Sequence, residues 1–333
     1  MRIALVATGG TIASRATPDG VVANVAGAEI LAAMGPGRVA GGAEVSVVDV
    51  GLRGSYSLTL DEMHDVAQRV RVECLGGADG VVVTHGTDSL EETSFLTDLL
   101  HEEETPVVFT GAQRPFDAAD GDGLDNLALA LSAASSHEWR GKGVLVAFGG
   151  RVMPARGVRK VHTTQLGAFD NPSYRGLDDA VRSTLPGAAV RLGSLAMPQV
   201  EVVAAVPGGS GFALRDAVRR RPAGIVFQAL GMGNASREDT AVVRDAVAQG
   251  IPVLITTRVQ RGPVQAVYGD GGGKTIEQAG AVFADDLTTW QARILLSVCL
   301  ALGPDGRAEH NVATWLARFA SGLSAFRLAR TPR

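Results

Sequence analysis

Short apolar runs recur along the chain, and a stretch with helical periodicity follows most of them. The runs are rich in valine and other β-branched residues, which is typical of buried strands. The strands expected in the first half of the chain are 2–7, 44–50, 80–83, 106–110 and 143–148. The helices expected between them begin near Ala28 and cover 60–74, 90–96 and 124–134. This alternation predicts a mostly parallel sheet with right-handed crossovers.

The alternation breaks at residues 149–175 and resumes on a smaller scale after a segment rich in proline and glycine. The elements expected there are strands at 224–227 and 252–257 and helices at 238–249 and 289–302. The sequence therefore predicts an α/β protein of two domains, a larger one with a mostly parallel sheet flanked by helices and a smaller parallel α/β domain. The expected bounds are 1–190 for the N-terminal domain, 191–212 for a linker that includes a weak strand at 199–206, and 213–333 for the C-terminal domain.

The turn at residues 85–88 follows a predicted strand and precedes a predicted helix. It thus lies at the carboxyl end of a strand, where ligands bind in open α/β sheets. Ser89 with Glu92 has the spacing of a capping box, and so has Thr59 with Glu62. A hydroxyl beside a carboxylate in the turn suggests chemistry, but the same side chains could serve only to cap the helix. Both interpretations stay open at this point.

Two other segments are rich in glycine. Gly9 and Gly10 follow the first strand, where backbone N–H groups can come close to a ligand. The polar residues 14–27 predict a mobile loop beside that turn. The segment 268–275 nearly matches a phosphate-binding loop, but Tyr268 stands where glycine is needed and no strand leads into it. We therefore expect a flexible surface loop at 269–273 and no nucleotide site.

Composition narrows the class of protein. An apolar content of 46% with 20% charged residues is ordinary for a globular protein, and the net charge of −4 with no basic patch argues against nucleic acid as a partner. No apolar run approaches the roughly 20 residues that span a bilayer, so we expect no membrane association and a cytoplasmic protein. Cys74 and Cys299 sit in apolar helical patterns and are interpreted as buried hydrophobic residues. The six histidines show no metal-ligand spacing, so neither a metal nor another cofactor is expected.

Three turns at strand ends carry hydroxyls, namely those of Thr11, Ser55 and Thr87. A threonine hydroxyl is a weak nucleophile unless a base or a positive charge activates it, and a lysine with a lowered pKa can do so. Lys160 is a candidate for this role, with Asp88 to hold it or to bind a substrate ammonium. Backbone N–H groups of the glycine turns would stabilise an oxyanion, each contributing on the order of 3 kcal/mol. These groups suffice for acyl transfer from a small amide or ester, although spacing alone does not establish that they converge.

Several of these segments resemble signatures of a known family. Residues 7–13 (ATGGTIA) and 84–93 (THGTDSLEET) are similar to the two signatures of bacterial-type L-asparaginases. Residues 107–115, 156–164 and 231–234 also resemble segments of that family, so the resemblance extends over almost the whole chain.

The resemblance implies hydrolysis of L-asparagine, and possible hydrolysis of L-glutamine, to the acid and ammonia through a threonine-linked acyl-enzyme. By position, Thr11 is the nucleophile, and Thr87, Asp88 and Lys160 form a supporting group. The residues that the resemblance implies for substrate binding are Gly10, Ser55, Tyr56, Gly86, Thr87, Asp88, Ala112 (through its carbonyl) and Asn234 (from a neighbouring subunit). The family assembles as homotetramers with each site at the interface of two chains.

The sequence departs from the family pattern at three positions. Val21 stands where the mobile loop usually carries a tyrosine that assists the nucleophile. Tyr56 replaces a common glutamine, and Tyr268 lies near the place of a glutamate from the neighbouring chain. We hypothesise that one of these two phenols partly replaces the missing groups. A related amidase that acts on glutamine, D-asparagine or a larger amide, and a catalytically weak amino-acid sensor, remain as alternatives.

Overall fold

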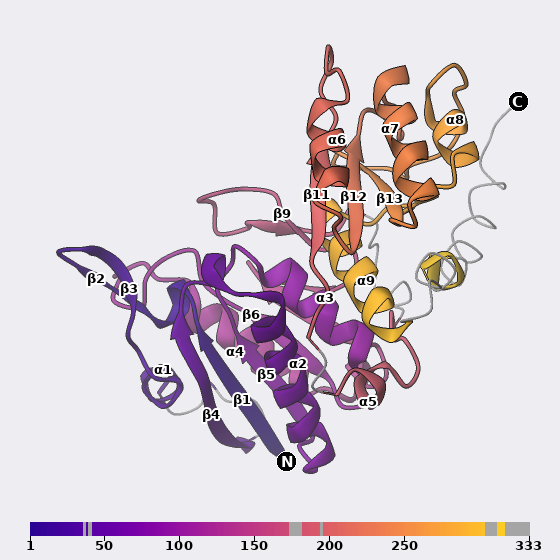
Figure 1. The fold of residues 1–333 in the computed structure, drawn as a ribbon. Coiled ribbons are helices and arrows are strands. Elements are labelled where there is room, and N and C mark those ends of the chain that lie inside the picture. The colour runs from indigo at the N-terminus through magenta and orange to yellow at the C-terminus, as the bar shows by residue number, and fades with distance from the viewer. Residues whose placement is uncertain (36–37, 39–41, 173–181, 194–195, 304–311, 317–333) are drawn as a thin grey trace, which may run out of the picture. The chain divides into compact units, whose positions relative to one another are not determined.

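The computed structural model describes residues 1–35, 38, 42–172, 182–193, 196–303 and 312–316. The chain divides into two compact units, Met1–Val190 and Arg191–Arg333, and each contains its own mainly parallel sheet (Figure 1). The predicted two-domain α/β class is confirmed. The last part of the predicted second domain, residues 317–333, lies outside the described residues.

The first unit is built on a six-stranded sheet in the order β4-β1-β5-β6-β7-β8. Its first five strands are parallel, and β8 runs antiparallel to β7, which is where the predicted alternation breaks. The strands are β1 (Arg2–Gly9), β4 (Glu44–Arg53), β5 (Gly80–Thr84), β6 (Val107–Thr110), β7 (Val144–Phe148) and β8 (Arg151–Pro154). The helices that cover the sheet are α1 (Gly27–Ala33), α2 (Leu60–Leu75), α3 (Leu90–Leu100) and α4 (Gly123–Ala134).

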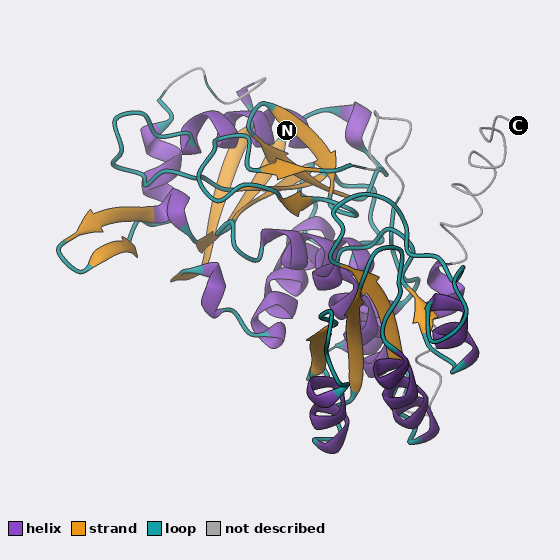
Figure 2. Ribbon diagram, turned by 90° about the horizontal axis from the view of Figure 1, so that it is seen from above, coloured by secondary structure: helices purple, strands orange, loops and turns teal. Residues whose placement is uncertain are grey.

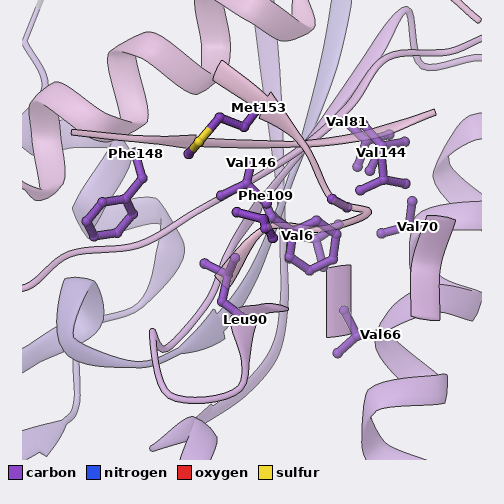
Figure 3. Packing of buried hydrophobic residues seen from close by; sticks show 14 of the residues in the cluster. Val6, Val66, Val70, Val81, Leu90, Phe109, Val144, Val146, Phe148 and Met153 are labelled. Carbon is purple, nitrogen blue, oxygen red and sulfur yellow. The ribbon is translucent and has the colours of Figure 1, made fainter. Parts of the chain in front are cut away.

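Successive residues of the central strands point to opposite faces and enter two separate hydrophobic cores. In β5, Val81 and Val83 join the core that includes Val66 of α2 and Leu90 of α3 (Figure 3). Val82 joins the other core, which includes residues of α1 and α4. Burial of each such side chain contributes roughly 1.5–3 kcal/mol. This double-sided burial explains why the strands appear in the sequence as continuous apolar runs.

Residues 14–23 form a hairpin within the segment 14–27, where the sequence predicted a polar mobile loop. Its strands are β2 (Ser14–Thr17) and β3 (Gly20–Ala23), which project from the first unit in Figures 1 and 2. The turn between them uses Pro-Asp-Gly chemistry, and the Thr17 hydroxyl donates to the Gly20 carbonyl at 2.7 Å. The main-chain N–H of Phe116 donates to the Ser14 carbonyl at 2.8 Å, so the base of the hairpin is anchored to the unit.

The second unit has a four-stranded parallel sheet in the order β11-β12-β13-β14. Side chains of α6, α7 and α8 share one hydrophobic core with the sheet, while α9 contacts β11, β12 and β13. The strands are β11 (Val200–Ala204), β12 (Gly224–Ala229), β13 (Val253–Thr257) and β14 (Val282–Phe283). The helices are α6 (Phe212–Arg219), α7 (Arg237–Ala248), α8 (Gly273–Gln278) and α9 (Thr289–Leu302), and a further helix, α5 (Ala188–Leu192), spans the division between the units.

Two local expectations about the second unit need correction. The predicted linker 191–212 contains β11, which pairs with β12 and is therefore part of the second unit's sheet. The predicted flexible loop at 269–273 has three buried glycines, Gly271 to Gly273. The Thr240 hydroxyl donates to the Gly271 carbonyl, and α8 begins at Gly273. Contacts with residues distant in sequence hold a segment whose composition resembles that of a free loop.

The two expected capping boxes have different outcomes. At the start of α2, the Thr59 hydroxyl accepts from the Glu62 N–H, and the Glu62 carboxylate accepts from the Thr59 N–H, as predicted. At the start of α3, the Ser89 hydroxyl makes no capping bond and donates to the Ser55 carbonyl at 2.8 Å. The prediction of the second capping box is therefore wrong, because the Ser89 hydroxyl bonds to the turn that contains Ser55 instead of to the N-terminus of α3.

Candidate active site

Three turns of the first unit surround a cavity of about 540 Å³. They follow β1, β4 and β5, which are adjacent strands of a parallel sheet, so their carboxyl ends meet at one edge. The β2–β3 hairpin supplies a further part of the lining. The lining residues are Gly10, Thr11, Ser14, Val21, Val22, Ala23, Leu52, Arg53, Gly54, Ser55, Tyr56, Ser57, Gly86, Thr87 and Asp88.

Glycines allow the three turns to approach more closely than side chains would permit. Gly10 has φ +79° and ψ −176°, and a Cβ there would lie 2.3 Å from the Gly86 Cα. A Cβ on Gly86 would lie 2.6 Å from the Ser55 Oγ. The Gly10 N–H donates to the Arg53 carbonyl at 2.9 Å, which ties the first turn to the second. This bond also corrects one expectation, because the Gly10 N–H is occupied and does not serve as an oxyanion donor.

The Ser55 hydroxyl lies against the start of α3. Its Oγ accepts hydrogen bonds from the N–H groups of Asp88 at 3.1 Å and Ser89 at 3.3 Å. Two accepted bonds use the lone pairs of a hydroxyl, so its proton is left to donate elsewhere. Because Ser55 lines the cavity, it can offer that proton to a negatively charged group of a ligand.

Lys160 reaches this edge from a separate part of the chain. It ends the short strand β9 (Arg159–Lys160), which pairs only with β10 (Phe169–Asp170) among the described strands. The Lys160 Nζ donates to the Thr87 Oγ1 and to the Asp88 Oδ1, each at 2.8 Å. A hydroxyl, an ammonium and a carboxylate therefore stand in hydrogen-bonded contact beside the cavity. Such a group can hold a proton and pass it to or from a reacting atom.

Thr11 stands on the opposite turn, at the start of a short 3₁₀ helix (Thr11–Ala13). Among the residues that the structure describes, its hydroxyl makes no hydrogen bond. The same part of the chain offers no acceptor to the main-chain N–H groups of Thr11 and Thr87. The cavity is thus lined by one hydroxyl without a partner, by a second hydroxyl in contact with a cation, and by two unused N–H groups.

His85 is the first residue of the turn at 85–88 and is fully buried, and its ring Nδ1 lies 2.8 Å from the Gly86 carbonyl. Only a protonated Nδ1 can donate to a carbonyl, so the proton of the neutral ring lies on Nδ1. Burial lowers the pKa of His85 to about 4. The ring is therefore neutral near pH 7, and its bond to the Gly86 carbonyl holds the main chain of the turn.

Ala112 is fully buried and is not among the residues that line the cavity. Its loop lies close to the site, because a Cβ on Gly111 would meet the Thr87 Cγ2 at 3.5 Å. The Asp122 carboxylate accepts from the N–H of Gln113, and an Asn126 N–H donates to the Gly111 carbonyl at 3.0 Å. These two polar side chains fix the main chain of the loop, and neither was predicted from the sequence as a site residue.

Several lining residues were also missed by the sequence reading. The Ser14 hydroxyl donates to the Gly10 carbonyl at 2.7 Å and so helps to hold the first turn. Tyr56 was predicted to bind substrate. In the structure its side chain is 81% exposed and its ring packs against Gly54. A Cβ on Gly54 would lie 2.2 Å from the Tyr56 ring. The glycine before Ser55 was the only sequence signal for this packing.

Asn234 and Tyr268 belong to the second unit. The Asn234 Oδ1 accepts from the Gly273 N–H at 3.0 Å and so holds the start of α8. Tyr268 is 58% exposed. No other hydrogen bond of the Asn234 side chain occurs within the described ranges, so its amide N–H groups stay available for a ligand.

The structure also bears on the other sequence expectations. Cys74 and Cys299 are buried and unpaired, and burial raises the pKa of each thiol to about 12. The described residues contain no group of three or more acidic, histidine or cysteine side chains that could hold a metal ion. In the same part of the chain, no helix has the length and apolar character needed to cross a membrane.

Comparison with known families gives two matches that together span most of the chain. Residues 2–185 match the N-terminal asparaginase domain, and residues 199–311 match the glutaminase/asparaginase C-terminal domain. The chain belongs to the asparaginase family. A probable L-asparaginase of Deinococcus radiodurans is 37% identical over 316 residues, with 91% of this chain and 94% of the relative covered. An L-asparaginase of Bacillus licheniformis is 34% identical, with 92% of this chain and 97% of the relative covered.

A solved structure agrees with this assignment. The crystal structure of a probable cytoplasmic L-asparaginase from Campylobacter jejuni superimposes with a TM-score of 0.78 at 26% identity. The superposition covers 94% of this asparaginase family member and 99% of the other chain. The fold is therefore shared over both units.

Proposed function

We propose that this asparaginase family member hydrolyses L-asparagine to L-aspartate and ammonia through an acyl-enzyme on Thr11. The observation that carries the proposal is the placement of the Lys160 Nζ, 2.8 Å from both Thr87 Oγ1 and Asp88 Oδ1, beside a cavity that Thr11 also lines. The L-asparaginase names of the relatives support the same substrate.

The cavity offers complementary groups for each end of the amino acid. The Ser55 hydroxyl donates to the α-carboxylate, since its own lone pairs are already engaged. The Asp88 carboxylate, which is 53% exposed and touches Lys160 through one oxygen, accepts from the α-ammonium. This arrangement directs the side-chain amide toward Thr11 and the loop of Ala112, and the backbones of Gly10 and Gly86 form the floor between them.

The reaction then proceeds in two balanced halves. After the Lys160 ammonium has given up one proton to solvent, the Thr11 oxygen attacks the amide carbon while its proton passes through the Thr87 hydroxyl to the Lys160 amine. The N–H groups of Thr11 and Thr87 stabilise the oxyanion. The C–N bond breaks, the nitrogen takes the proton, and ammonia leaves an ester on Thr11. A water molecule adds to the ester, its proton returns to the Thr11 oxygen, and aspartate is released.

We also propose that the protein works as a homo-oligomer, with a tetramer as the expected state, in the cytoplasm. An amide N–H of Asn234 from a second copy then donates to the substrate, which the bond of its Oδ1 to Gly273 leaves it free to do. The Campylobacter relative carries the name of a probable cytoplasmic enzyme, which supports this location. Light scattering of the purified protein tests the oligomeric state.

Val21 supplies only an apolar side chain at the cavity, so a phenol from elsewhere is proposed to assist the nucleophile. Tyr56 is favoured because it lines the cavity, with Tyr268 of a second copy as the other candidate. Replacing each in turn by phenylalanine removes only the hydroxyl. At least one variant should lose kcat, and full kcat in both would end the hypothesis.

Ammonia release from L-asparagine, L-glutamine and D-asparagine tests the function, with wild type and Thr11→Ala compared. The proposal requires release from L-asparagine that Thr11→Ala abolishes. Preference for L-glutamine would indicate a related amidase. The matched C-terminal domain is named for glutaminases as well as asparaginases. Binding of aspartate without any ammonia release would identify the protein as a sensor and refute the proposal.

A further inference from the structure

The first turn of α3 carries a buried carboxyl group that the reaction above does not use. Glu91 is only 7% exposed, and its Oε2 accepts a hydrogen bond from the main-chain N–H of Lys160 at 2.9 Å. The two residues are 69 positions apart in the sequence. Burial raises the pKa of Glu91 to about 7, and the charge of Glu92 adds to this, while bonding to Lys160 and the charge of Arg159 oppose it. Burial of a carboxyl group is energetically costly, so a buried carboxyl group beside a site is a candidate for a functional role.

The contact gives Lys160 two anchors on the same short segment. Its ammonium is held by Thr87 and Asp88, which precede α3, and its main chain is held by Glu91, three residues after Asp88. The anchors lie at opposite ends of one side chain. The distance from the Lys160 backbone to the Thr87 hydroxyl is therefore set by two bonds to a rigid helix start.

The strand that carries Lys160 lies outside the main sheet of the unit. β9 comprises two residues and pairs with the two-residue strand β10, outside the six-stranded sheet. Within the described residues, β9 does not pair with β5 or with any other strand of the six-stranded sheet. The Glu91 carboxyl therefore supplies a link between the helix start and the strand that neither sheet provides.

We propose that Glu91 is a positioning residue for the reaction: by accepting the main-chain N–H of Lys160, its carboxyl group sets the distance between the Lys160 ammonium and the Thr87 hydroxyl. The inference rests on the proposed amidohydrolase function. A misplacement of about 1 Å at a reacting group can lower the rate on the order of 10²-fold, so a link of this kind affects kcat more than substrate binding.

Three substitutions separate the acceptor from the charge. Glu91→Gln keeps an oxygen at the same reach and should keep kcat for L-asparagine within about threefold. Glu91→Leu has a similar size but no acceptor, and it should lower kcat roughly 30- to 100-fold with KM changed less than threefold. Glu91→Asp draws the acceptor back by about 1.5 Å, one carbon–carbon bond, and should fall between the two. This last variant carries the test if Glu91→Leu does not fold.

Two controls show whether Glu91 acts through Lys160. In a Lys160→Met background, Glu91→Leu should cause no further loss of kcat, whereas independent effects would multiply. Hydrogen exchange at the Lys160 amide, which needs no activity, should stay slow in Glu91→Gln and become faster in Glu91→Leu or Glu91→Asp. Full kcat in Glu91→Leu or Glu91→Asp, or equal losses in Glu91→Gln and Glu91→Leu, would overturn the inference. Absence of ammonia release by wild type would instead refute the proposed function.

Discussion

The close approach of Gly10 to Gly86 allows a quantitative prediction for Gly10→Ala. Its φ of +79° with ψ of −176° belongs to a region that almost only glycine adopts, which costs on the order of 1–3 kcal/mol for alanine. The new Cβ would lie 2.3 Å from the Gly86 Cα and 2.4 Å from the Gly86 N. Ordinary carbon contacts are about 3.5–4.0 Å, so the two turns must separate by roughly 1 Å. Such overpacking adds about 1–3 kcal/mol.

The expected loss in the free energy of unfolding is therefore about 2–6 kcal/mol. The same separation moves Thr11 away from Thr87, so kcat for L-asparagine should fall on the order of 10²-fold. Urea unfolding measures the first quantity and ammonia release measures the second. The new Cβ would meet main-chain atoms of Gly86 and His85, so rotation of a side chain cannot relieve the clash.

Gly250→Ala is the matched control. Gly250 has φ +77°, lies just after α7 in the second unit, and has no atom within 4 Å of an added Cβ. Alanine there should cost only the backbone penalty of about 1–2 kcal/mol and leave kcat unchanged. Equal stability losses in Gly10→Ala and Gly250→Ala, with full turnover in both, would show that close packing of the two turns does not position the site.

Three further predictions follow from the site. Thr87→Val, which keeps the shape but removes the hydroxyl from the Lys160 Nζ, should lower kcat about 10³-fold and change the unfolding free energy by about 1 kcal/mol, as ammonia release and thermal unfolding would show. Ser55→Ala should raise KM for L-asparagine and destabilise the protein by about 1–3 kcal/mol, because the N–H groups of Asp88 and Ser89 lose their acceptor; unchanged KM would contradict the assignment of Ser55 to substrate binding. The pKa of His85 is about 4 in the folded protein and about 6.5 in the unfolded chain, so the unfolded chain binds the proton first as the pH falls. The free energy of unfolding should therefore decrease between pH 6.5 and pH 4, by about 3 kcal/mol in total. The unfolding free energy of His85→Asn should depend less on pH across this window than that of wild type, and parallel curves would contradict the assigned burial effect.

Much of the fold was predictable from local patterns. The helix expected at 289–302 is α9 at the same residues, and the strand expected at 80–83 is β5 with one residue added. Both elements are buried on several sides, so apolar runs mark them clearly. The hairpin at 14–23 was missed because its strands are short and only one of their residues is buried, so the pairing leaves no apolar alternation in the sequence.

The site was only partly predictable. Thr11 and the turn at 85–88 follow apolar strands, and a parallel sheet brings the ends of adjacent strands together. The sequence left two roles open for that turn, a helix cap or a catalytic turn. In the structure the Ser89 hydroxyl contacts Ser55 and makes no cap, while Thr87 and Asp88 contact Lys160. The choice depended on partners 34 to 73 residues away, which no local pattern reveals.

Local patterns in the sequence were enough to predict most of the strands and helices, the parallel pairing of the strands, and the turns that carry hydroxyls. These properties depend on hydrogen bonds and burial that repeat every few residues, so they appear in the sequence as periodic patterns of apolar residues. Three features depend on long-range packing: the contact of Lys160 with Thr87, the bond of Glu91 to the Lys160 main chain, and the close approach of the turns at their glycines. Those contacts are single events between distant segments, and packing of the whole unit brings them about.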